Sequence, residues 1–221
     1  MADHNESDIP VPEGTPAPGT RSSVEKPLQN DASARMLAAA GFEKPAEQSE
    51  TIPLREVLYL HVDVSDVTKT IALALSQIGI TKGEFATSVD AACEKLKAAA
   101  EAGTPVSLMI VGKQINQSGT LQGPTLLNLA KELQKIRSNP DKAKSLQTLR
   151  TIILFSSTGT IEDVHALQEL LPGCTIESIR KPAKLPVLLK RTVLALKTSG
   201  TIADSESEQT IGMINVAHPE T

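Results

Sequence analysis

The sequence predicts an α/β fold in which a parallel β-sheet is covered by helices on both faces. Short apolar runs rich in β-branched residues recur along residues 54–198, and such runs are typical of strands covered on both faces. They alternate with segments whose apolar residues recur at spacings of three and four, as in amphipathic helices. A regular strand–helix alternation indicates right-handed crossovers in one parallel sheet.

Five strands alternate with five helices in this region. The expected strands are residues 57–62, 85–89, 106–111, 150–155 and 174–179. The expected helices are residues 67–78, 90–102, 124–136, 161–171 and 185–196. Residues 138–147, which are polar and rich in lysine, interrupt the alternation and are expected to form an extended loop or a helix extension.

Both ends of the chain have a different composition. Residues 1–50 are rich in Pro, Glu, Ser and Asp, so we expect a disordered acidic tail there and a second one at 199–221. Residues 51–199 carry a net charge of +5, although the whole chain is at −4. The chain has no apolar run long enough to cross a bilayer, no secretory signal pattern, and only Cys93 and Cys174 as cysteines. These features favour a cytoplasmic protein that does not insert in a membrane.

The candidate functional residues follow the predicted strands. Asp63 comes after the first strand, Val111 and Gly112 end the third, Ser156 follows the fourth, and Lys181 follows the fifth. The carboxyl ends of parallel strands share one edge of a sheet, and ligands of open α/β sheets bind there. We therefore expect these side chains to gather at one rim.

The order and lengths of these elements resemble the receiver domain of two-component response regulators. Receivers end their first strand with an acidic pair, their third with the phosphoacceptor Asp, their fourth with Ser or Thr and their fifth with Lys-Pro. Lys181-Pro182 matches the last motif, Ser156 the hydroxyl, and Asp63 the second acid. The resemblance covers residues 54–198 and implies a flavodoxin-like fold, with a five-stranded sheet in the order 2-1-3-4-5.

The chain departs from the receiver pattern where the phosphoryl group would be held. Val62 replaces the first acid, and the phosphoacceptor position is Val111, or Gly112 if the register slips by one. Neither residue can form an acyl phosphate. Asp63 alone is too little for Mg²⁺, which prefers several oxygen ligands. The resemblance thus implies a pseudo-receiver, with no catalytic residue, no metal and no cofactor. We expect Lys181 to pair with Asp63 in place of the ion, and a ligand role for Lys181 is the alternative.

Such a protein is expected to signal by protein contact rather than as an enzyme. By resemblance, the partner is a histidine kinase, a phosphotransfer protein or another receiver, and a homodimer is left open. Receivers commonly use their fourth helix, fifth strand and fifth helix as the partner surface, which here are residues 161–171, 174–179 and 185–196.

Other interpretations have less support in the sequence. The turn Ser156–Thr160 resembles the phosphate loop of flavodoxins, which makes a small phosphate, nucleotide or flavin site the alternative function. The buried-strand position of His61 favours a satisfied core or surface imidazole over a ligand. The lysines and arginines at 131–150 have no aromatic neighbours for base stacking, so we expect no nucleic-acid partner.

Overall fold

A computed structural model of the chain describes residues 51–63, 67–113 and 125–219. These residues belong to the unit Gln48–Thr221. The predicted disordered tail at 1–50 lies outside the described residues.

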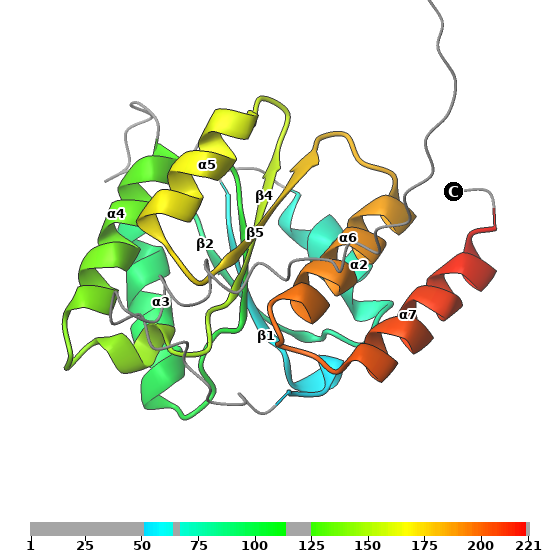
Figure 1. Cartoon of the computed structure of the whole chain (residues 1–221), viewed down its shortest axis with the longest axis horizontal. Helices are drawn as coiled ribbons and strands as arrows, with labels where there is room; N and C mark the ends of the chain where they lie inside the picture. Colours follow the sequence, from blue (N-terminus) through cyan, green and yellow to red (C-terminus); the bar gives the residue numbers. More distant parts are fainter. Residues whose placement is uncertain (1–50, 64–66, 114–124, 220–221) are drawn as a thin grey trace, which may run out of the picture. The chain divides into compact units, whose positions relative to one another are not determined.

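The described strands form one parallel sheet in the order β2-β1-β3-β4-β5 (Figure 1). The strands are β1 (Leu58–Val62), β2 (Lys82–Ala86), β3 (Leu108–Val111), β4 (Thr151–Ser156) and β5 (Thr175–Arg180). All four strand pairings are parallel. The predicted flavodoxin-like topology is therefore confirmed.

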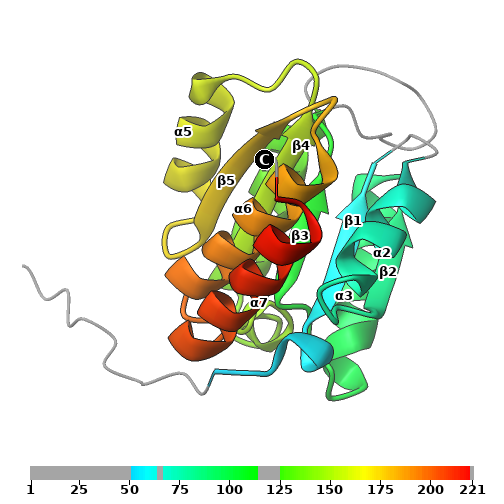
Figure 2. The ribbon, with the colours of Figure 1, turned by 90° about the vertical axis from the view of Figure 1, so that its right-hand side faces the viewer.

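Helices cover both faces of the sheet. One face carries α3 (Val89–Glu101), α4 (Thr125–Ser138) and α5 (Ile161–Leu170), and the other carries α2 (Thr68–Ser76), α6 (Leu185–Thr198) and α7 (Asp204–Ala217). Two short 3-10 helices, η1 (Leu54–Glu56) and η2 (Ala143–Leu146), complete the described elements. Below, the two sides are called the α3–α4–α5 face and the α2–α6–α7 face. Figure 2 shows α6 and α7 side by side on the second.

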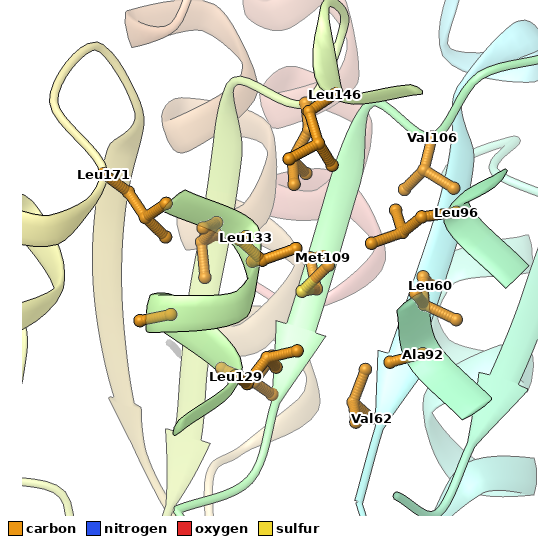
Figure 3. Packing of buried hydrophobic residues seen from close by; sticks show 14 of the residues in the cluster. Leu60, Val62, Ala92, Leu96, Val106, Met109, Leu129, Leu133, Leu146 and Leu171 are labelled. Atoms are coloured by element: carbon orange, nitrogen blue, oxygen red, sulfur yellow. The ribbon is translucent and has the colours of Figure 1, made fainter. Parts of the chain in front are cut away.

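Alternation along the strands divides the core into two apolar clusters. On the α3–α4–α5 face, Leu60, Val62 and Met109 of the central strands meet Leu96 of α3 and Leu133 of α4 (Figure 3). All five are at most 1% exposed. Burial of this apolar area is the main force that holds the helices on the sheet.

Local signals fix several helix ends. Ser88 caps α3 by accepting a hydrogen bond from the backbone N–H of Ala91 at 3.2 Å. Pro186 lies in the first turn of α6, where its missing N–H is not needed. The chain leaves α2 through Gly79 and α5 through Gly173, each at a positive φ of 87° that favours glycine.

The predicted second strand at 85–89 is wrong by three residues. β2 covers Lys82–Ala86, and Val89 already belongs to α3. β2 is an edge strand of which only Ala86 is fully buried, so it does not carry the apolar run of a central strand. Val89, at 2% exposure, is apolar because the first turn of α3 packs on the core.

The predicted disordered tail at 199–221 is also wrong over most of its length. Residues Asp204–Ala217 form α7, which packs on α6 and buries its Ser207, Thr210 and Ile214. Glu206 also accepts a hydrogen bond from the backbone N–H of Leu54 at 3.0 Å. These contacts offset the chain entropy that composition alone suggested would keep the segment disordered.

The lysine-rich segment 138–147 is neither a long loop nor a helix extension. After α4 ends at Ser138, the chain turns and forms η2, which packs on α3 and α4 with Ser145 and Leu146 buried. Among the described residues, no helix is both long enough and apolar enough to span a bilayer.

Candidate functional site at the carboxyl edge of the sheet

The carboxyl ends of β1 and β3 lie side by side. Val62, the last residue of β1, pairs in register with Val111, the last residue of β3. The ladder continues one step further, since Gly112 donates its N–H to the carbonyl of Val62 at 2.9 Å and Asp63 donates to that of Ala86 at 3.1 Å. Asp63 is thereby fixed beside Gly112 at the rim, as the sequence predicted.

The two candidate positions for the missing phosphoacceptor differ in surroundings. Val111 packs into the apolar cluster of the α3–α4–α5 face. Gly112 lies against the Asp63 side chain, because a Cβ built on it would be 2.9 Å from both Cγ and Oδ2 of Asp63. Gly112 is therefore the position that shares the rim with Asp63, and its missing side chain is what gives the Asp63 carboxylate room.

Lys181 reaches the same point from beyond β5. Its backbone N–H donates to the carbonyl of Ser156 at 3.0 Å, and its Nζ lies 4.8 Å from the centroid of the Phe155 ring. The same Nζ donates to Asp63 Oδ2 at 2.6 Å, so the predicted pair is present. The Asp63 side chain is 6% exposed and that of Lys181 is 22% exposed. The pair is mostly withdrawn from water, and salt screens it less than a surface pair.

The turn 156–160 satisfies its own polar groups. The Ser156 hydroxyl accepts the N–H of Thr158 at 3.2 Å, so Ser156 joins the rim through its backbone while its hydroxyl serves the turn. Thr160 and Asp163 form a capping box at the start of α5. The Asp163 carboxylate thus already accepts hydrogen bonds from donors at the start of α5 that a bound phosphate would need. The geometry gives no support to the alternative phosphate, nucleotide or flavin site.

Lys113, which the sequence interpretation did not single out, joins the end of β3 to α5. Its Nζ donates to Asp163 Oδ2 at 2.8 Å and to the carbonyl of Thr158 at 3.2 Å. Partial burial works against ionisation of Asp163, but hydrogen bonds from Lys113 and Thr160 hold the pKa of this carboxyl below its usual range. The only sequence signal was the position of Lys113 just after the third strand.

His61 lies beside the Asp63–Lys181 pair, two residues earlier in the chain and so on the same face of the sheet. It is 1% exposed, and its Nε2 is 3.9 Å from Asp63 Oδ2. Neither ring nitrogen has a hydrogen-bond partner among the described residues. Of the satisfied core or surface imidazole that the sequence suggested, the structure shows the core position, but it shows no hydrogen bond to either nitrogen among the described residues. Burial lowers the pKa of His61 to about 4, although the charge of Asp63 acts to raise it.

This depressed pKa predicts a pH dependence of stability. In the unfolded chain His61 has its ordinary pKa of 6.5, so the unfolded state binds a proton as the pH falls through 6.5. In the folded state His61 binds this proton only near pH 4. Stability contributed by neutral His61 is therefore complete above pH 6.5 and is lost as the pH falls toward 4, by up to about 3 kcal/mol. Urea unfolding across this range should show the wild type losing up to about 3 kcal/mol relative to His61→Leu, which has no imidazole to protonate. Parallel curves would refute the assignment.

The rim does not fit the magnesium ion of a receiver. Within the described ranges, no three His, Cys, Asp or Glu side chains could share a metal ion. The carboxylate that does remain, Asp63, already holds the ammonium of Lys181. A divalent cation that prefers several oxygen ligands would have to displace this ammonium and find its other ligands elsewhere.

Comparison with known proteins gives solved structures only. No family model matches the sequence, and a search of curated proteins also found no match. Similar structures include the signal receiver domain of an HD domain-containing protein from Pseudomonas fluorescens Pf-5, with 21% identity over 65% of this chain and 96% of that one, at a TM-score of 0.46. The chemotaxis protein CheY4 of Vibrio cholerae has 17% identity over 63% of this chain and 98% of that one, also at 0.46.

A response regulator receiver protein from Pseudomonas putida gives a similar result, with 22% identity over 62% of this chain and 94% of that one, at a TM-score of 0.41. These likenesses are too distant to assign a function to this chain.

Proposed function

We propose that the protein is a pseudo-receiver, a signalling module that acts through protein contact and accepts no phosphoryl group. The observation that carries the proposal is the position of the Lys181 ammonium, 2.6 Å from Asp63 Oδ2 at the place where Gly112 has no side chain. In a receiver this space takes the phosphoacceptor carboxylate and its cation. Here an internal ion pair fills it, and the glycine beside it has no group to phosphorylate.

The Lys181–Asp63 pair also supports a rim that keeps one conformation. A receiver changes conformation when charge is added at its carboxyl edge, and a two-state element shifts only if a ligand binds its two states differently. Lys181 already neutralises Asp63. Lys113 already joins the end of β3 to the first turn of α5. Both links hold the rim in one arrangement without an added group, which suits a module whose activity depends on whether a partner is present.

The proposed partner surface consists of α5, β5 and α6. Val187 and Leu194 lie seven residues apart on α6 and are 38% and 48% exposed, and Ile161 at the start of α5 is 70% exposed. Arg191, which lies between Val187 and Leu194 in α6, forms a salt bridge of 3.0 Å with Glu177 of β5, and this contact fixes α6 against the edge strand. Exposed aliphatic residues with a charged rim are typical of protein interfaces. We expect a histidine kinase, a phosphotransfer protein or another receiver to bind here.

This proposal predicts binding that is independent of phosphodonor and sensitive to one aliphatic residue. The immobilised chain is tested against histidine kinase, phosphotransfer and receiver domains of the source organism, with and without acetyl phosphate and Mg²⁺. Leu194→Glu should weaken binding about tenfold or more, because a buried unpaired charge costs at least 1–2 kcal/mol at an interface. Gln134→Glu, which adds the same charge on the exposed side of α4, is the control. Binding that appears only with phosphodonor would contradict the proposal.

A further inference from the structure

We infer that α7, together with the C-terminal half of α2, forms a surface on which two copies of this chain associate. The inference does not depend on the proposed pseudo-receiver role. It uses the α2–α6–α7 side of the sheet and none of the exposed residues assigned to the α5–β5–α6 partner surface.

The surface carries exposed aliphatic residues from both helices. Met213 and Val216 of α7 are 55% and 84% exposed, and Leu73 of α2 is 67% exposed. A hollow of about 170 Å³ lies between the two helices, lined by Gln77 on one side, Met213 on the other and the buried Leu189 of α6. Gln77 is one turn beyond Leu73 on the same face of α2. Met213 thus borders the hollow directly, while Leu73 and Val216 lie one turn from the lining residues Gln77 and Met213.

Gly212 lies on this surface, and no contact among the described residues requires a glycine there. It is exposed within the helical segment of α7, and a Cβ built on it would meet nothing within 4 Å. Neither intrachain packing nor a positive φ requires glycine there. Glycine is the least favourable helix residue after proline. A glycine between exposed apolar residues does allow the backbone of a second helix to come close. Gly212 marks where that helix would cross.

The charges favour a second copy as the occupant. Residues 209–217 of α7 and 70–78 of α2 contain no Asp, Glu, Lys or Arg, and His218 is the titratable residue that lines the hollow. In a two-fold interface each patch meets its own copy, so a charged patch would face like charges, whereas an uncharged one does not. The acidic residues of α7, which are Asp204, Glu206 and Glu208, lie toward its N-terminus. An antiparallel crossing at Gly212 keeps the acidic ends of the two helices apart and opposes their dipoles.

Sedimentation velocity of the full chain over a dilution series tests this inference. We expect the wild type to approach twice the monomer mass as its concentration rises. Met213→Glu should raise the dimer dissociation constant by roughly a hundredfold, because two like charges would meet across the two-fold axis. Gln134→Glu adds the same charge on an exposed residue of α4, on the opposite side of the sheet, and it should leave the dimer unchanged.

A second variant separates association from helix stability. Gly212→Leu replaces a poor helix residue with a good one in open space, so it should raise the melting temperature of the monomer while it weakens the dimer. A glycine with only an intrachain role would not give these opposite signs. The inference is overturned if the wild type stays monomeric at every concentration. It is also overturned if Met213→Glu and Gly212→Leu dimerise like the wild type, or if the surface binds only a different protein.

Discussion

Replacing Lys181 with alanine is expected to lower the free energy of unfolding by about 2–4 kcal/mol at neutral pH, as loss of one partner from a buried ion pair does. The change leaves the Asp63 carboxylate, 6% exposed, without the ammonium that lies 2.6 Å from it. It also removes the cation over the Phe155 ring. Urea unfolding followed by circular dichroism measures the loss.

A matched control comes from a second lysine with the same geometry. Lys95 contacts Glu84 at 2.6 Å as well, but the two side chains are 38% and 47% exposed. Lys95→Ala should therefore cost no more than about 1 kcal/mol. The double variant Lys181→Met with Asp63→Asn should recover part of the loss, because it removes both charges together. If Lys181→Ala lowers the free energy of unfolding no more than Lys95→Ala does, the Lys181–Asp63 pair contributes no more to stability than an exposed ion pair.

Ile214→Ala in α7 is expected to lower the free energy of unfolding by about 2–4 kcal/mol, the usual cost of a cavity at a buried Ile. Ile214 is 4% exposed and packs in the cluster of the α2–α6–α7 face. Asn215→Ala, its exposed neighbour in the same helix, should change stability by less than about 0.5 kcal/mol. Chemical denaturation of both variants measures the difference. Equal, negligible effects would mean that residues 204–217 behave as the disordered tail that composition suggested.

The central strands could be predicted from sequence because their buried residues are almost all apolar. β1, β3 and β4 are buried on both faces, so Leu60, Ile110 and Ile153 lie in apolar runs with no alternation. β2 could not be placed as well, because an edge strand needs fewer apolar residues. α7 was missed for a similar reason, since two of its buried residues, Ser207 and Thr210, are polar and leave little helical periodicity.

The rim was predictable only in part. Asp63 and Lys181 could be brought together because topology alone puts the carboxyl ends of parallel strands at one edge. The contact of Lys113 with Asp163 spans fifty residues and depends on how α5 docks, which no local pattern encodes. The lack of a hydrogen-bond partner for His61 among the described residues likewise depends on which side chains surround it. The choice between Val111 and Gly112 depended on a one-residue register that spacing could not fix.

Intact-mass spectrometry after incubation with acetyl phosphate and Mg²⁺ tests the central claim most directly, with an intact receiver domain as the positive control. We expect the positive control to gain a phosphoryl group and this chain to gain none, in the wild type and in Lys181→Ala alike. A phosphoryl group mapped to Asp63 would contradict it.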